Sequence, residues 1–437
     1  MFRNVCCAVA LATAAVPASA QDAELSKLRE ALRQLQEEVR QLEKRLEDAE
    51  RRPPAAPPPA PAAARAAGSS AFNPDISLIL QGTAARSSRD PNTYQISGFA
   101  PSGGEVAPAP RGFNLGESEL VIASNVDPYF RGQLAAALTP ENELEVEEAF
   151  FQTLALGRGF TLKGGRFLSG IGYQNEIHQH AWDFQDAPLA YKAFLGGRLN
   201  DDGVQLRWLA PTDLFVELGA ELGRGRTFPG TDRNRNGANS WSAFGHVGGD
   251  IGASTAWRSG LSYLRTSPQD RAFTDLDVTQ SFSGTSRLWI ADFVLKWSPQ
   301  GDPSVTNFKL QGEYFRRRES GTLAFDQTLS DGYASRQSGW YAQAVYQFMP
   351  RWRAGYRHDR LEHGTVANDL GLTAQDAPLL LTDYNPTRNS AMLDWSPTEF
   401  SRWRLQYAVD KSRVGVTDNQ LLLQYILSLG AHGAHQF

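Results

Sequence analysis

This chain of 437 residues has only two cysteines, Cys6 and Cys7, and both lie near its start. They belong to a segment with an early arginine, an apolar run over residues 5–16 and a small-residue cleavage site at residues 18–20. This pattern predicts a secretory signal over residues 1–20. A mature chain without cysteine would exclude disulfides and thiolate metal sites.

The chain also lacks long apolar runs and a strong net charge. Beyond the signal, no stretch approaches the roughly 18 uninterrupted apolar residues that a membrane-spanning helix needs, which excludes a helical membrane protein. The formal net charge of −5 gives no reason to expect nucleic acid as a partner. No G-x-S-x-G motif is present, so we predict that the protein is not an enzyme, with a barrel lipase or protease as the alternative.

A heptad pattern follows the predicted signal over residues 21–52. Apolar residues recur at alternating steps of three and four, at Leu25, Leu28, Leu32, Leu35, Val39, Leu42, Leu46 and Ala49. This predicts a short oligomerising coiled coil, a stalk in the periplasm that could contact the cell wall; a single solvated helix is the alternative. Residues 53–71, rich in proline and alanine, predict an extended linker.

Residues 72–437 show segments of about ten residues that alternate apolar and polar positions, separated by turn residues, which predicts an all-β transmembrane antiparallel β-barrel. We count sixteen strands, although one missed or invented pair would give about 14 or 18. The predicted strands begin near Ile76, Phe113, Tyr129, Leu144, Phe160, Gly203, Leu214, Trp241, Thr255, Arg287, Asn307, Gly339, Trp352, Asn389, Arg402 and Asn419.

Short and long connections alternate along this region, as they do in barrels of the bacterial outer membrane. The long connections are expected over residues 87–112, 169–202, 223–240, 320–338 and 362–388. We therefore predict an outer-membrane location with the apolar face against lipid. The rival interpretation is a soluble all-β barrel, which would bury its apolar face inside.

If the apolar face meets lipid, the polar face lines a lumen. Strands eleven, thirteen and fifteen then form a predicted arginine wall of Lys309, Arg317, Arg351, Arg353, Arg357, Arg402 and Arg404. Strands two, four and seven form a predicted acidic wall of Glu117, Glu119, Glu145, Glu147, Glu217 and Glu221. Opposed walls would set up a transverse field that orients charged solutes, whereas the simpler interpretation is that lumen positions collect charges of both signs.

The longest connection, over residues 169–202, is expected to fold into the barrel and narrow it. Glu176, Asp183 and Asp186 on this loop would face the arginine wall and form a constriction. The H-x-H spacing of His178 and His180 places both imidazoles on one side, where Glu176 and Asp183 could complete a weak zinc site that is lost below about pH 6. The alternative is that both histidines only form hydrogen bonds, and no other cofactor is expected.

Several segments resemble a group of bacterial outer-membrane barrels labelled zinc-regulated outer-membrane proteins. They are FNPDISLILQG, ELEVEEAF, GRFLSGIGY, HQHAWDFQDAPLAY and DDGVQLRWLAPTDLF, at residues 72–82, 143–150, 165–173, 178–191 and 201–215, and the closing GAHGAHQF. The order of stalk, linker and sixteen strands also resembles the phosphate-selective porin O and P family and DcaP-like trimeric porins. The related label of TonB-dependent receptor does not fit, because such receptors have about 22 strands and a plug domain.

The resemblance implies a homotrimeric diffusion or substrate-selective porin with a link to metal limitation. Together with the charged lumen, it predicts a channel for small hydrophilic, charged solutes. A zinc-related uptake protein and a non-conducting envelope tether are the alternatives.

Overall fold

The computed structural model describes residues 74–103, 106–139 and 143–430, and the isolated positions Glu30, Arg33, Glu37 and Arg40. These four positions are helical and exposed. The predicted signal, the remainder of the stalk, the linker and the last seven residues lie outside the described residues, so those expectations stay predictions. Within the described part, no helix has the length and apolar character needed to cross a membrane.

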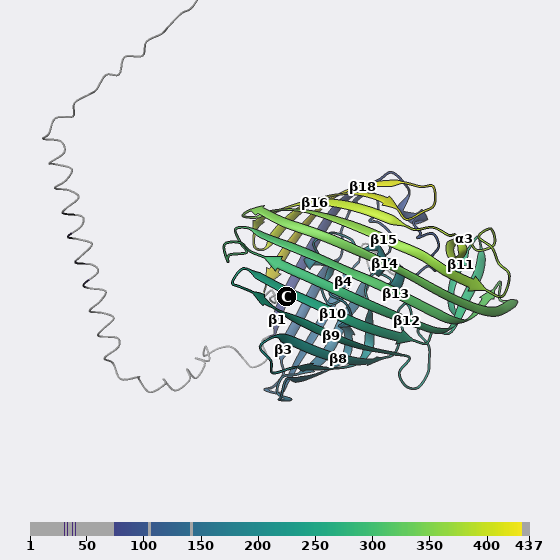
Figure 1. The fold of residues 1–437 in the computed structure, drawn as a ribbon, viewed down its shortest axis with the longest axis horizontal. Helices are drawn as coiled ribbons and strands as arrows, with labels where there is room; N and C mark the ends of the chain where they lie inside the picture. Colours follow the sequence, from purple (N-terminus) through teal and green to yellow (C-terminus); the bar gives the residue numbers. More distant parts are fainter. Residues whose placement is uncertain are drawn as a thin grey trace, which may run out of the picture. The chain divides into compact units, whose positions relative to one another are not determined.

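The described residues from 74 onward form a closed antiparallel barrel (Figure 1). The strands are β1 (Asp75–Ser87), β2 (Gly112–Asn114), β3 (Ser118–Asn125), β4 (Phe130–Leu138), β5 (Leu144–Thr153), β6 (Phe160–Leu168), β7 (Asn200–Leu209), β8 (Phe215–Gly223), β9 (Ser240–Ile251), β10 (Thr255–Thr266), β11 (Arg271–Asp275), β12 (Val278–Trp297), β13 (Asn307–Phe325), β14 (Leu329–Met349), β15 (Trp352–Asn368), β16 (Thr387–Thr398), β17 (Ser401–Lys411) and β18 (Asp418–Gly430). The short helices are η1 (Pro91–Thr93), η2 (Gln179–Ala181), α2 (Leu189–Leu195) and α3 (Pro378–Leu381).

These elements fill sixteen positions around the barrel, which confirms the predicted strand number. β2 and β3 both pair with β1 and share one position, while β11 forms a hairpin with the outer part of β12. β18 pairs with β1 from Ser77 opposite Gly430 to Ser87 opposite Gln420, and this pairing closes the ring.

The two faces of the strands have opposite character. On β17, Trp403 and Tyr407 point outward and are 39% and 47% exposed, whereas Arg404 and Gln406 point inward and are 1% and 3% exposed. Because side chains alternate along a strand, an apolar outer face and a polar inner face follow from the same pattern. This arrangement is the reverse of a soluble barrel, so the rival interpretation is wrong.

The strands differ in length around the barrel. One predicted long connection is therefore wrong. β12 to β15 contain 17 to 21 residues, against 9 in β4, β6 and β8. In Figure 1 the long strands reach the end where β11 and α3 lie. The expected long connection over residues 320–338 is instead a continued hairpin, with a tight turn at Asp326 and Gln327. Both turn residues have positive φ angles, which suits the right-handed twist of a hairpin.

The connection between β6 and β7, residues 169–199, lies inside the barrel and is named here the lumen loop. Its helix α2 is buried along its whole length. α2 packs against apolar side chains that point inward from β12 to β15: Leu288, Ile290, Phe315, Tyr341 and Leu361. The barrel therefore contains a small hydrophobic core of its own, which fixes one half of the lumen loop against the long strands.

Candidate functional site

The lumen loop is fastened to both sides of the barrel. Asp183 and Asp186 contact cations on β13, β15 and β16, while His178 and His180 contact carboxylates on β3 and β5. The loop therefore crosses the lumen between a cationic and an acidic region of the wall. The predicted approach of Asp183 and Asp186 to the arginine wall corresponds to the contacts found.

On the cationic side, Asp183 accepts hydrogen bonds from Lys309 Nζ at 3.0 Å and from Arg353 Nη1 at 3.1 Å. Asp186 lies 3.3 Å from Arg357 and 3.0 Å from Arg388. Burial raises the pKa of the Asp183 carboxyl, but Lys309 and Arg353 outweigh it and hold that pKa below its usual value. Asp183 is therefore charged at neutral pH, although it is buried.

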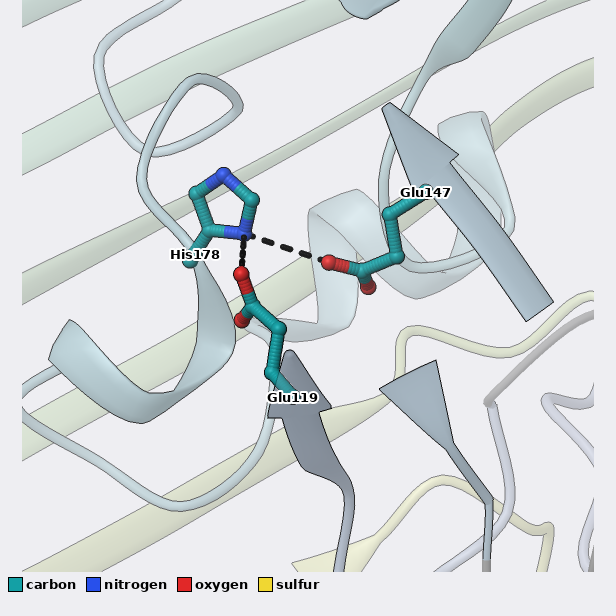
Figure 2. A group of neighbouring side chains, drawn as sticks. All are labelled: Glu119, Glu147 and His178. Atoms are coloured by element: carbon teal, nitrogen blue, oxygen red, sulfur yellow. Dashed lines mark hydrogen bonds and ion pairs between the residues drawn. The ribbon is translucent and has the colours of Figure 1, made fainter. Parts of the chain in front are cut away.

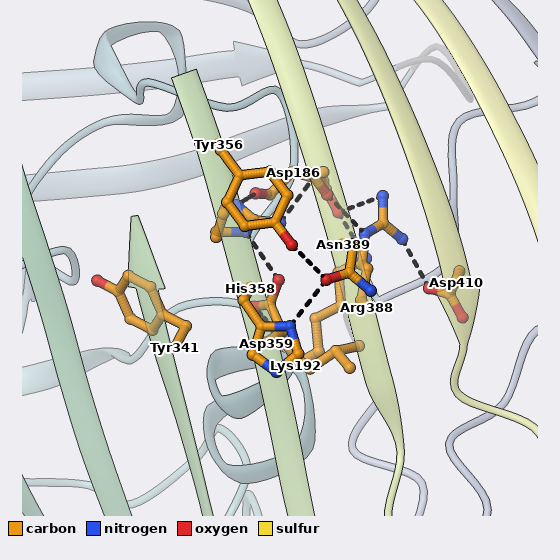
Figure 3. Close-up of polar contacts among 12 residues, drawn as sticks. Asp186, Lys192, Tyr341, Tyr356, His358, Asp359, Arg388, Asn389 and Asp410 are labelled. Carbon is orange, nitrogen blue, oxygen red and sulfur yellow. Dashed lines mark hydrogen bonds and ion pairs between the residues drawn. The ribbon is translucent and has the colours of Figure 1, made fainter. Parts of the chain in front are cut away.

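Carboxylates that the sequence reasoning missed lie between the cations of this wall. Asp394 on β16 lies 2.9 Å from Arg404, and Arg388 lies 2.7 Å from Asp410. Figure 3 shows Arg388 between Asp186 and Asp410. The predicted wall of one charge is thus a ladder of ion pairs. Alternating Arg and Asp on facing strands was the signal that could have revealed it.

Arg351 and Arg317, which the sequence predicts to line the pore, lie away from the open lumen. Arg351 is exposed in the turn between β14 and β15, where it donates to the Pro397 carbonyl at 2.7 Å. Glu145 is exposed near the start of β5, opposite Ala137 of β4, and its place in the pore lining stays a prediction. Arg317 is fully buried beneath α2 and donates to the Ala193 carbonyl, so it supports the loop from outside the open space.

The predicted zinc site of His178, His180, Glu176 and Asp183 is also wrong in two of its ligands. Glu176 pairs with Arg207 of β7, away from the cationic strands, and Asp183 is occupied by Lys309 and Arg353. The mistake arose because the loop bends between these positions, so closeness in sequence does not bring the side chains together. Arg402 of β17 donates to the backbone carbonyl of His180 and anchors this bend.

A β-bulge shapes the acidic side. Ala135 of β4 pairs with Glu148 and Ala136 pairs with Val146, so Glu147 is the extra residue. A bulge of this kind interrupts alternation, and here Glu147 and Glu148 are both buried towards the lumen. Glu117 and Glu119 are buried next to them, at 6% and 2% exposure. Around the bulge, the acidic wall therefore contains one more carboxylate, that of Glu148, than the sequence predicted.

His178 inserts between these carboxylates (Figure 2). Its Nδ1 lies 3.1 Å from both Glu119 and Glu147, and its Nε2 lies 3.1 Å from Glu148. Burial opposes a charge on the ring, but the three neighbouring carboxylates outweigh it and raise the pKa of His178 well above its usual value. His180 lies next to it, with its Nδ1 3.0 Å from Glu119.

A buried glutamate holds the beginning of the loop. Glu313 of β13 accepts hydrogen bonds from the backbone N–H groups of Tyr173 and Gln174 at 3.1 and 3.0 Å. It also accepts from the hydroxyls of Tyr191 and Tyr341. Four hydrogen bonds from the loop and its surroundings converge on this one side chain, so Glu313 is a main anchor of the loop.

Two cavities adjoin the lumen loop. One, of about 1350 Å³, is lined by His178, His180, Glu119 and by residues near the short turns of the barrel. The other, of about 620 Å³, is lined by Lys296, Lys309, Arg353 and Asp183. Lys296 and Lys309 face each other directly across β12 and β13. Like charges opposite each other destabilise a sheet, and here Asp183 compensates by pairing with Lys309.

The sequence of this barrel is similar to that of one other bacterial protein. No protein-family profile matches the chain. An uncharacterized protein of Aquifex aeolicus is 33% identical over 402 residues, which cover 84% of this chain and 80% of that protein. The chain belongs to the same family as this Aquifex protein. The name of that relative gives no activity, so membership by itself assigns none.

Solved structures show the same fold with little sequence identity. OmpT of Vibrio cholerae in its trimer form has a TM-score of 0.51 at 11% identity, covering 82% of this chain and 99% of that one. The outer membrane channel DcaP of Acinetobacter baumannii has 0.50 at 9% (82% and 97%). An anion-selective porin from Comamonas acidovorans has 0.51 at 8% (82% and 99%).

The fold is thus that of outer-membrane porins, which confirms the resemblance at this level. The resemblance to zinc-regulated proteins stays a prediction, as does the expectation that the protein is not an enzyme.

Proposed function

We propose that this protein is an outer-membrane channel for small hydrophilic, charged solutes, in which the lumen loop and the cationic strands border the narrowest part of the passage. The observation that carries the proposal is the position of the loop. It crosses the lumen, and its charged half borders cavities on the side of the short turns. Solutes that pass the loop would meet Lys309, Arg353 and Asp183.

The charge of this region favours anions. Lys296, Lys309 and Arg353 line the cavity against two carboxylates, Asp183 and Asp250. Asp183 is already bound to Lys309 and Arg353, so one positive charge remains in excess. Positive charge in a confined lumen concentrates anions and repels cations. The likeness to the anion-selective Comamonas porin agrees with this preference without establishing it.

We further propose a homotrimer in the outer membrane, with the stalk of residues 21–52 in the periplasm. The apolar outer face of the barrel suits contact with lipid and with other copies of the barrel. The trimer form of Vibrio OmpT supports this assembly by analogy of fold.

Conductance in planar lipid bilayers tests the channel function. The purified full-length protein is expected to give stable steps of conductance, and a reversal potential on the anion side in a salt gradient. An Arg351→Gln variant is a suitable control, because this arginine lies in an exposed turn. A protein that inserts as a folded barrel and conducts no ions would refute the proposal and favour the tether.

A further inference from the structure

We propose that Glu119, Glu147 and His178 form a binding site for a divalent transition-metal ion of the zinc class, which would fasten the lumen loop to β3 and β5. The three ligand atoms, Oε of each glutamate and Nδ1 of the histidine, all lie within 4.8 Å of one another (Figure 2). This inference concerns the loop and is independent of whether the barrel conducts.

The spacing of the ligand atoms suits a metal ion. His178 Nδ1 lies 3.1 Å from Glu119 Oε1 and 3.1 Å from Glu147 Oε2. With metal–ligand distances of about 2.0–2.1 Å, two ligands of a tetrahedral site lie about 3.3 Å apart. Small side-chain movements would therefore place both oxygens and the nitrogen around one ion.

An unpaired buried oxygen points to the same place. Glu119 is 2% exposed, and among the described residues its Oε1 has no hydrogen-bond donor, although it lies beside His178 Nδ1. That nitrogen carries at most one proton, and its hydrogen bond is directed at Glu147. One proton does not satisfy both carboxylates, whereas a metal ion at their common focus would.

The second nitrogen of His178 is arranged as in known metal sites. Nε2 lies 3.1 Å from Glu148 Oε2, and Glu148 is itself held by the side chain of Gln133 at 3.0 Å and by the backbone N–H of Leu168 at 3.1 Å. Metal-binding histidines usually donate their other N–H to a carboxylate, which directs the free lone pair at the metal. Glu148 would fix His178 in the tautomer that presents Nδ1 as a ligand.

Charge balance also favours a cation. Glu117, Glu119, Glu147 and Glu148 are each less than one-tenth exposed, and Arg198 is ion-paired with Glu117 and Glu147. Four carboxylates meet one arginine and two histidines at this point. A metal ion would supply the positive charge that His178 gives up when its Nδ1 becomes a ligand, and buried charges are normally paired or bound to metals. A nitrogen ligand with carboxylates is typical of zinc and related metals, because calcium and magnesium prefer oxygen ligands alone.

The fourth position would come from His180 or from solvent. His180 lies beside Glu119, and its ring centre is 5.9 Å from that of His178. Glu119, His178 and His180 all line the cavity of about 1350 Å³, so an ion could enter from there. This set replaces the partners that the sequence alone suggested, Glu176 and Asp183.

Zinc titration of the full-length protein, stripped of metal and held in detergent, tests the site. Calorimetry is expected to show one equivalent of zinc that is lost in His178→Ala/His180→Ala and bound at least tenfold more weakly in Glu119→Gln. His358→Ala, which removes a histidine outside this cluster, should bind as the wild type does. Cobalt(II) should give a visible absorption band in the wild type that Glu119→Gln weakens.

The Glu119→Gln variant guards against misfolding, because it preserves the size of the side chain and one acceptor oxygen. Equal zinc uptake and affinity in the wild type and the double histidine variant would overturn the site, as would a wild type that takes up no zinc. The binding assay measures no current, so its result and that of the conductance assay are separate.

Discussion

The lysine pair on β12 and β13 gives a sharp test of whether this lumen selects ions by charge. Lys296 and Lys309 lie opposite each other and line the cavity beside the lumen loop. In the double variant Lys296→Gln/Lys309→Gln, two positive charges are removed while the length of the side chains is nearly kept. Asp183 retains Arg353 and Gln343 as partners, so the loop should stay in place.

The size of the effect follows from Coulomb's law. In a water-filled lumen, one charge about 6 Å from a passing ion changes its energy by roughly 0.7 kcal/mol without salt, and by about 0.4 kcal/mol at ~0.1 M salt. Each lysine attracts anions and repels cations, so both effects enter the selectivity. Together the two substitutions should lower the anion-to-cation permeability ratio about tenfold at ~0.1 M salt, and only about twofold at ~1 M.

Reversal potentials in a salt gradient measure this ratio. The matched control is Arg316→Gln/Arg318→Gln. It also removes two positive charges, but both come from the exposed outer face of β13. The control should keep the wild-type ratio. If the lysine variant kept the ratio as well, ions would not pass this cavity, and the assignment of the basic side as the selective one would be wrong.

Three further predictions concern assembly and stability. Deleting residues 21–52 should leave trimers in mild detergent, as judged by light scattering, because barrel surfaces bury more area than four heptads; only monomers would contradict this. Glu313→Ala should expose the lumen loop to limited proteolysis and destabilise the protein by about 2–4 kcal/mol, whereas Glu145→Ala should have little effect. Arg388→Gln should destabilise by about 3–5 kcal/mol, because it leaves the buried carboxylate of Asp410 without its cation. Its thermal unfolding temperature should lie well below that of Arg351→Gln.

The strand number could be predicted from the sequence because alternation continues through every strand that contacts lipid. Strand ends were less predictable. β12 and β14 begin nine and ten residues before the predicted starts at Arg287 and Gly339. Outside the lipid the outer face no longer has to be apolar, so the alternation that marks a strand fades while the hydrogen-bonded ladder continues.

The inner face was partly predictable for the same reason. Arg353, Arg357 and Arg404 point inward as expected, because side chains alternate between the two faces of a regular strand. The alternation of side chains is broken at the bulge of β5, where Glu147 and Glu148 both point inward. No residue type in that stretch specifies a bulge, because the extra residue is set by pairing with β4, a contact that sequence periodicity does not contain.

The two halves of the lumen loop show why its position could be foreseen and its contacts could not. The half around α2 is held by apolar packing against Phe315 and Leu361, and packing of this kind depends on shape rather than on particular partners. The half from Glu176 to Asp183 is held by ion pairs, and each pair depends on a specific residue of the wall. Substitutions in the first half should therefore change stability, and substitutions in the second half should change what the channel binds and selects.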